Sequence, residues 1–136
     1  MVSVGKIDLH MHSTVSDGTD APCELISRVE NAGITIFSLT DHDAVKGSEQ
    51  ILTEMSRRQT EGLSFITGVE FSCRDEKGKY HILGYGYQPS AESIRSVVDY
   101  GHSLRMQKVR KRIDFIGNEF GFVFPKQELE KLYSMD

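Results

Sequence analysis

The chain has 136 residues, of which 38% are hydrophobic and 9% aromatic, and it carries 16 Lys and Arg against 20 Asp and Glu. This length predicts one globular domain, since single cores of about 100–150 residues are the commonest. The formal net charge of −4 argues against a protein that mainly coats nucleic acid or an anionic membrane, because such proteins carry a basic excess. No run approaches the roughly 20 apolar residues of a membrane span, and the N-terminus lacks the features of a signal peptide. We therefore expect a cytoplasmic protein with no membrane partner.

The first half of the chain alternates predicted strands with predicted helices. Strands that alternate with helices in this way indicate consecutive βαβ units, and hence an α/β fold with a parallel sheet or barrel. The expected elements are a strand over 6–9, a helix from Pro22 to just before Gly33, a strand over 34–39 and a helix over 46–61. A third strand is expected to begin with the apolar run 63–66 and to end at 68–70, with Glu70 as its last residue.

The second half has a different pattern. Residues 71–74 and 80–87 flank a short charged stretch that contains glycine, which predicts a hairpin or a strand with a short excursion. Apolar residues then recur mostly every three or four positions, which predicts one long helix with Ser90 as its N-cap and an end near 117–121. A further helix is expected to start at Pro125.

Histidines and carboxylates follow the predicted strands. His10 and His12 come directly after the first strand, and residues two apart in an extended chain point to the same side. Asp17 lies in the next loop, where its carboxylate can fold back towards them. His42 and Glu70 follow the second and third strands, whose carboxyl ends meet on one face of a parallel α/β fold. We therefore expect these five side chains on one rim.

His81 lies in the fourth predicted strand, and its distance from this rim depends on how that strand is oriented. A mixture of imidazole and carboxylate ligands suits zinc, manganese or iron, and a carboxylate such as Glu70 can bridge two ions. Taken singly, a histidine or aspartate at a strand end is more often a packing or capping residue. The joint pattern favours a metal site.

Other polar residues are expected to have supporting roles. Asp8 and Asp41 are interpreted as hydrogen-bond partners of the site rather than as ligands. Asp43 is expected to cap the helix that follows it. His102 lies inside the predicted long helix, and we expect it on the surface or in the core.

Two features allow either a structural or a functional interpretation. Cys23 and Cys73 are too far apart for a zinc-ribbon or disulfide framework, and we expect both to be buried small apolar residues, with metal ligation as the alternative. A basic cluster in the long helix is expected to be a solvated face, with phosphate or nucleic-acid binding as the alternative. This basic cluster consists of Arg105, Lys108, Arg110, Lys111 and Arg112.

Four motifs resemble, in the same order, those of the PHP (polymerase and histidinol phosphatase) family. They are 8–13 (DLHMHS) with 16–18 (SDG), 39–43 (LTDHD), 68–72 (GVEFS) and 81–85 (HILGY). The resemblance extends from residue 6 to about residue 125. It is strongest to the stand-alone metal-dependent phosphoesterases of the family, whose members hydrolyse phosphate esters, including nucleotide phosphates and short RNA ends.

The resemblance implies a distorted (β/α)7 TIM-like barrel that holds two or three divalent ions of zinc, manganese or iron. Bound cations lower the pKa of a water molecule to give hydroxide near neutral pH, so no catalytic side chain is assigned beyond that water. The implied activity is hydrolysis of small phosphomonoesters, nucleotides or oligonucleotide ends, with nucleic acid expected only as a substrate. By position match, the implied metal ligands are His10, His12, Asp17, His42, Glu70 and His81.

The chain departs from the family in its length. Members of this branch are longer and draw further ligands from a second half, so we expect the PHP barrel to be incomplete in this chain. One PHP domain is expected over 1–136, with the metal motifs in 6–88 and a helical insertion in 90–136. We expect an N-terminal fragment or a natural truncation that another chain or a homo-oligomer completes, and the sequence leaves open whether it is active alone. The alternative is a catalytically inactive module that binds metal for a structural or interaction role.

Overall fold

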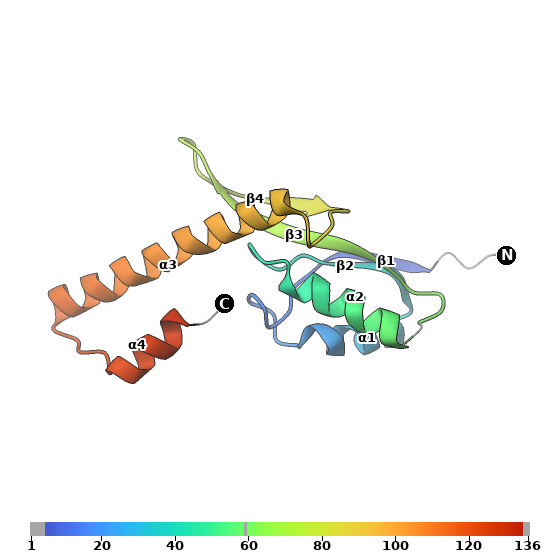
Figure 1. Cartoon of the computed structure of the whole chain (residues 1–136), viewed down its shortest axis with the longest axis horizontal. Coiled ribbons are helices and arrows are strands. Elements are labelled where there is room, and N and C mark those ends of the chain that lie inside the picture. The colour runs from blue at the N-terminus through green and yellow to red at the C-terminus, as the bar shows by residue number, and fades with distance from the viewer. Residues whose placement is uncertain (1–4, 59, 135–136) are drawn as a thin grey trace. The chain divides into compact units, whose positions relative to one another are not determined.

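The structure is a computed structural model that describes residues 5–58 and 60–134, and it has an α/β fold (Figure 1). Four strands form one sheet in the order β1-β2-β3-β4. The elements in chain order are β1 (Lys6–Met11), α1 (Pro22–Asn31), β2 (Ile34–Leu39), α2 (Lys46–Arg58), β3 (Ser64–Arg74), β4 (Lys79–Tyr85), α3 (Glu92–Phe120) and α4 (Lys126–Tyr133).

The sheet is parallel over its first three strands, as predicted, and β4 is antiparallel to β3. It is also strongly curled. The hydroxyl of Tyr85 in β4 donates a hydrogen bond of 2.8 Å to the carbonyl oxygen of Leu9 in β1, although these are the two outer strands. In a flat sheet they would lie about 14 Å apart, since neighbouring strands are about 4.7–4.9 Å apart. The sheet therefore forms part of a barrel wall, and Tyr85 lies on its inner face.

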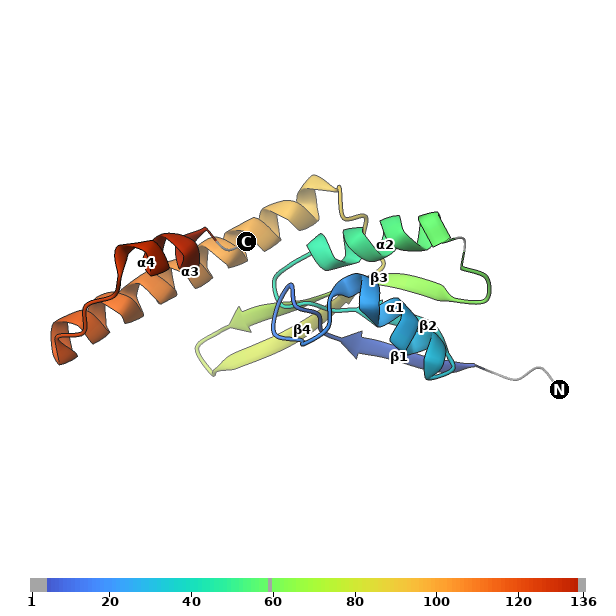
Figure 2. The ribbon, with the colours of Figure 1, turned by 90° about the horizontal axis from the view of Figure 1, so that it is seen from below.

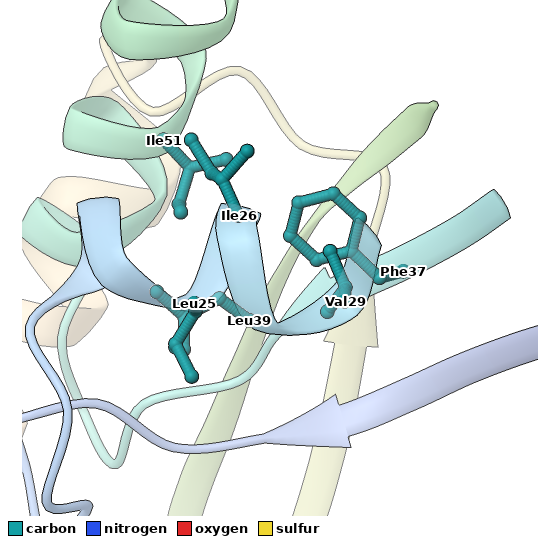
Figure 3. Close-up of a cluster of buried hydrophobic side chains, with 6 residues drawn as sticks. All are labelled: Leu25, Ile26, Val29, Phe37, Leu39 and Ile51. Carbon is teal, nitrogen blue, oxygen red and sulfur yellow. The ribbon is translucent and has the colours of Figure 1, made fainter. Parts of the chain in front are cut away.

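Helices α1 and α2 cover the outer face of the sheet (Figure 2). Apolar residues recur at helical spacing on α1 and contact side chains of β2 and α2 (Figure 3). Burial of this one face stabilises both helices against the sheet and leaves their other sides to solvent. The cluster consists of Leu25, Ile26, Val29, Phe37, Leu39 and Ile51.

The ends of α1 follow from local sequence. Pro22 occupies its first turn, where a missing backbone N–H costs nothing. The backbone N–H of Ala21 donates a hydrogen bond of 2.8 Å to the carboxylate of Glu24. After the helix, Gly33 takes a positive φ of 70°, a conformation that favours glycine. These contacts set the helix at the predicted residues.

The predicted hairpin is confirmed, and its strands are β3 and β4. Asp75 closes the turn, because its Oδ1 accepts hydrogen bonds from the backbone N–H groups of Lys77 (2.7 Å) and Gly78 (2.9 Å). The turn thus keeps the two strands in register up to the pair formed by Arg74 and Lys79.

The predicted end of the third strand was wrong. β3 does not stop at Glu70 but continues to Arg74. Glu70 lies inside the strand, since it pairs with Leu83 of β4 on one side and forms a parallel bridge with His42 on the other. Glu70 thus lies beside His42, in the segment that follows β2. The prediction that Glu70 and His42 lie close together is therefore confirmed.

The start of α3 packs against β3 and the loop before α2, in a cluster separate from that of α1 and α2. Its Val98 joins a small buried cluster with Val45 and Val69. The helix begins at Glu92, so Ser90 is one position too early to be its N-cap. The other end is as predicted, because the helix stops at Phe120.

Residues from His102 onward form a separate compact unit that contains most of α3 and all of α4. Within it, the guanidinium of Arg110 lies 5.0 Å from the ring centroid of Tyr133, a cation–π contact. All five residues of the basic cluster are exposed. Among the described residues, no helix has the length and apolar character needed to cross a membrane.

The two cysteines differ from their prediction. Cys23 and Cys73 are free and half-buried rather than buried. Cys23 lies in the first turn of α1, outside the buried stripe of that helix. Cys73 is the last residue but one of β3, where the burial pattern alternates between half-buried and exposed residues.

Candidate metal centre

The irregular end of β1 brings two histidines to the inner face of the sheet. The register of β1 against β2 shifts between Asp8 and Met11, and such a bulge redirects side chains. Met11 packs against the outer core. His10 and His12, on either side of it, both reach the carboxylate of Glu70. The expectation that these two histidines lie on the same side is confirmed.

The carboxylate of Glu70 lies at the centre of the cluster and is only 4% exposed. Its Oε2 lies 2.8 Å from His10 Nε2, 3.1 Å from His12 Nε2 and 3.9 Å from His42 Nε2. Its Oε1 lies 2.7 Å from His81 Nδ1. Four imidazoles from three strands and their loops thus converge on one carboxylate.

The antiparallel direction of β4 decides the position of His81, which the sequence left open. His81 pairs with Ser72, two residues along β3 from Glu70. Paired residues of antiparallel strands lie on the same face, as do residues two apart in one strand. His81 therefore lies on the same face as Glu70.

Asp17 contributes the second carboxylate from the loop after β1. Its Oδ1 lies 3.4 Å from His12 Nδ1, and its Oδ2 lies 3.7 Å from His42 Nε2. All six residues singled out from the sequence are therefore close together. Their donor atoms form three overlapping groups, within each of which the atoms lie within 4.8 Å of one another. The groups are His10, His12 and Glu70, then His12, Asp17 and His42, and then His42, Glu70 and His81.

The loop that carries Asp17 is held by the buried carboxylate of Asp41. Asp41 Oδ1 accepts hydrogen bonds from Ser13 N (2.7 Å) and Ser16 Oγ (2.8 Å), and Oδ2 accepts one from Ser13 Oγ (2.7 Å). Asp41 and Ser13 are 1% and 0% exposed. Asp41 thus has the hydrogen-bonding role expected of it. The two serines were missed, because a serine in a loop carries no signal of its partner.

The start of α2 approaches the same carboxylate closely. A Cβ at Gly47 would overlap Asp41 Oδ2, so glycine is required for this approach. The first turn of a helix favours a negative charge beside it, and α2 begins at Lys46. Asp41 therefore connects the site loop to the second helix.

The other two aspartates contact backbone. Asp8 Oδ1 accepts a hydrogen bond of 3.2 Å from His10 N. Asp43 is not the expected helix cap, because α2 begins three residues later at Lys46. Its Oδ1 instead accepts a hydrogen bond of 2.8 Å from Ser72 N, and its φ of 49° marks a tight turn. Asp43 thereby joins the loop after β2 to β3.

Opposing effects act on the pKa of Glu70. Burial alone would raise its pKa, but the hydrogen bond with His10 and the positive potential of His42, His10 and His12 lower it below its ordinary value. Glu70 is therefore an anion at neutral pH. A buried carboxylate that stays ionised needs hydrogen-bonding or positively charged partners around it.

The donor set fits divalent metal ions. Ligands of one ion, at bond lengths of about 2.0–2.2 Å, lie at most about 4.4 Å apart, and the separations of 2.7 to 3.9 Å from Glu70 are within this limit. Among the described residues, no hydrogen-bond partner satisfies the buried Nδ1 atoms of His12 and His42. Buried polar atoms are rarely left without a partner. The cluster therefore has both the geometry and the free donor capacity to bind metal.

Comparison with known proteins agrees with these observations. A family model described as PHP domain matches residues 8–131 of the chain. The chain belongs to the PHP domain family. The expected α/β fold with an incomplete PHP barrel is thereby confirmed.

Two PHP relatives with curated names resemble most of the chain. A 5'-3' exoribonuclease of Haemophilus influenzae is 33% identical over 76% of this chain and 36% of its own length. A 3',5'-nucleoside bisphosphate phosphatase of Chromobacterium violaceum is 32% identical over 79% of this chain and 37% of its own length. The chain thus spans a little more than a third of the length of these relatives.

A solved PHP-like structure also matches the fold. It is the crystal structure of a protein from Bifidobacterium adolescentis that is regarded as a metal-dependent phosphoesterase. The TM-score is 0.76 at 23% identity, over 96% of this chain and 44% of that one. At this identity the likeness establishes the shared fold.

Proposed function

We propose that this chain forms the metal-binding part of a phosphoesterase that hydrolyses small phosphomonoesters, nucleotides or oligonucleotide ends. The observation that carries the proposal is the convergence of four imidazoles and a second carboxylate around the buried carboxylate of Glu70. The names of the two relatives support it, since an exoribonuclease and a bisphosphate phosphatase both break phosphate ester bonds.

Six residues would hold two or three ions of zinc, manganese or iron. Residues 6–88 would supply the metal ligands, and 90–136 would form a helical insertion of the same PHP domain. Bound divalent ions supply Lewis acidity, which activates water and neutralises phosphate oxygens. The proposed ligands are His10, His12, Asp17, His42, Glu70 and His81.

The chain's own residues have distinct tasks in this proposal. Glu70 is shared between two of the donor groups, so its carboxylate would hold neighbouring ions at a fixed spacing. Asp41 fixes the loop of Asp17 through Ser13 and Ser16, which keeps the second carboxylate in place. No side-chain nucleophile is required.

The proposal is tested by phosphate release from p-nitrophenyl phosphate and from nucleotides with added manganese or zinc. We expect His12→Ala and Glu70→Ala to reduce turnover at least 100-fold, because ligand loss removes the ion that activates water. His102→Ala is the matched control, since this histidine lies outside the cluster. Metal-dependent folding of the wild-type chain without turnover would contradict the enzymatic proposal and would favour a structural metal-binding module.

A further inference from the structure

A hydrogen bond joins the two outer strands of the curled sheet beside the candidate metal centre. The hydroxyl of Tyr85 in β4 donates it to the carbonyl oxygen of Leu9 in β1, at 2.8 Å and across 76 positions of sequence. Tyr85 lies four residues after His81 in β4, so both side chains are on the same face of that strand. Leu9 directly precedes His10. The bond therefore connects the strand that supplies one imidazole of the centre to the strand that supplies another.

The peptide group between Leu9 and His10 lies in the irregular part of β1. Between Asp8 and Met11, β1 takes three steps while its partner β2 takes two. The extra residue of such a bulge is left out of the regular ladder of backbone hydrogen bonds. Side chains hold this peptide group. Its N–H, from His10, donates a hydrogen bond of 3.2 Å to Asp8 in the same strand. Its carbonyl oxygen accepts the shorter bond from Tyr85, which ties the peptide group to another strand.

The imidazole of His10 depends on this peptide group because packing restrains it little. Its side chain is 51% exposed, against 23% for His12 and 14% for His42. Rotation of a peptide group moves the side chain that follows it, whereas metal–ligand distances tolerate a change of only about 0.2 Å. An anchor on the carbonyl of Leu9 therefore keeps the imidazole of His10 within reach of Glu70 and of an ion that the two residues share.

We propose that Tyr85 is a positioning residue of the metal centre and that it acts through His10. This inference rests on the proposed function and adds a residue that lies outside the set of ligands. The phenol links β4, which carries His81, to the peptide group before His10. It thereby keeps the donor group that contains His10 at a fixed separation from the donor group that contains His81. The role requires the hydroxyl, because a phenyl ring fills the same space but donates no hydrogen bond.

The test is a double-mutant cycle between Tyr85→Phe and His10→Ala on the full chain, with manganese binding followed by electron paramagnetic resonance. Tyr85→Phe removes only the hydroxyl. We expect it to weaken the binding of one manganese ion about tenfold, as for loss of a group that orients a metal ligand. In the His10→Ala background, the same substitution should change the affinity for the remaining manganese by less than about twofold, because the imidazole that it positions is absent.

Tyr80→Phe is the matched control, because it removes the same hydroxyl from the same strand. Tyr80 directly precedes His81 and so lies on the opposite face of β4, and its exposed fraction of 45% is close to the 42% of Tyr85. It should leave manganese affinity unchanged.

The unfolding temperature of the metal-free chain separates a positioning role from a general structural one. Both tyrosine variants should change it by less than about 4 °C, because water can replace the partner of an exposed hydrogen bond. A larger fall in Tyr85→Phe would overturn the proposal by showing that the hydroxyl holds the fold as a whole.

Three further outcomes separate this proposal from the one on which it rests. Equal weakening of manganese binding by Tyr85→Phe in both backgrounds, or no weakening in either, would overturn the positioning role and leave the phosphoesterase proposal standing. The expected coupling in a chain that hydrolyses no phosphate ester would support the positioning role and contradict the phosphoesterase activity. A wild-type chain that binds neither manganese nor, by calorimetry, zinc would contradict both proposals.

Discussion

Two buried carboxylates in this chain have unlike surroundings and unlike roles. Glu70 faces four imidazoles and has no backbone donor at its carboxylate among the hydrogen bonds of the described residues. Asp41 accepts three hydrogen bonds from Ser13 and Ser16 and lies at the start of α2. Glu70 therefore presents charge to ligands, whereas Asp41 uses its charge to hold a loop.

Asp41→Asn should separate these roles. The amide cannot accept hydrogen bonds at both ends, so a buried donor of Ser13 loses its partner, and we expect a loss of about 2 kcal/mol in the free energy of unfolding. Manganese affinity should fall more for the ion held by Asp17 than for the ion held by Glu70. Urea unfolding and manganese titration by electron paramagnetic resonance measure the two effects.

The control for this variant is Asp8→Asn. The Asp8 carboxylate accepts a single 3.2 Å hydrogen bond from a backbone N–H, and we expect its loss to cost about 0.5 kcal/mol or less. Equal effects of the two substitutions on stability and on manganese binding would show that the Asp41 network has no special role.

At the scale of elements, the outer layer depends on a few apolar contacts. Ile51 of α2 is 0% exposed in the cluster with α1 and β2, whereas its neighbour Leu52 is 39% exposed. We expect Ile51→Ala to lower the free energy of unfolding by about 3 kcal/mol, because it leaves a cavity. Leu52→Ala should cost less than about 1 kcal/mol. Similar losses in urea unfolding would contradict this packing.

We expect the stability of the fold to depend on pH through an ion-pair cluster near the end of α2. Hydrogen bonds from Arg57 and Arg58 lower the pKa of Glu54 from 4.5 to about 2. Because the folded-state pKa is the lower one, this pairing stabilises the fold above pH 4.5, and the stabilisation is lost as the pH falls towards 2. Glu54→Gln should therefore lower the unfolding temperature at pH 7 and match the wild type near pH 2. A difference that stays constant over this range would contradict the assignment.

The elements that could be predicted from sequence are those with local signals. Proline at the start of α1 and glycine after it mark both ends of that helix. The end of β3 was missed because its continuation past Glu70 depends on pairing with β4, a contact that periodicity does not show. The cap assigned to Asp43 failed for a similar reason, since its partner Ser72 lies 29 positions away.

The candidate site was more predictable than the fold around it. His10, His12, His42 and Glu70 follow strands or lie level with their ends, and the parallel order of β1, β2 and β3 brings them together. The position of His81 could not be predicted, because it depends on the antiparallel direction of β4, which the sequence left open. The curl of the sheet was also out of reach, because it depends on contacts between residues far apart in the sequence, such as that between Tyr85 and Leu9.

At the scale of the whole molecule, metal should stabilise the fold. Ions that bind the folded chain and not the unfolded one add about 2.7 kcal/mol at a concentration of 100 times Kd. We expect manganese or zinc to raise the unfolding temperature and EDTA to reverse the rise. Glu70→Gln should lose most of this response, and His102→Ala should keep it. An equal response in Glu70→Gln would place metal binding elsewhere.

The most direct test of the central claim is the number of metal ions per chain. Inductively coupled plasma mass spectrometry on chain loaded with manganese or zinc and then desalted gives this number for the wild type, Glu70→Gln and Glu54→Gln. Because Glu70 is shared between two donor groups, we predict at least two ions in the wild type and in Glu54→Gln, and at most one in Glu70→Gln. A wild-type chain that retains no ion, or a Glu70→Gln chain that retains as many as the wild type, would contradict the account.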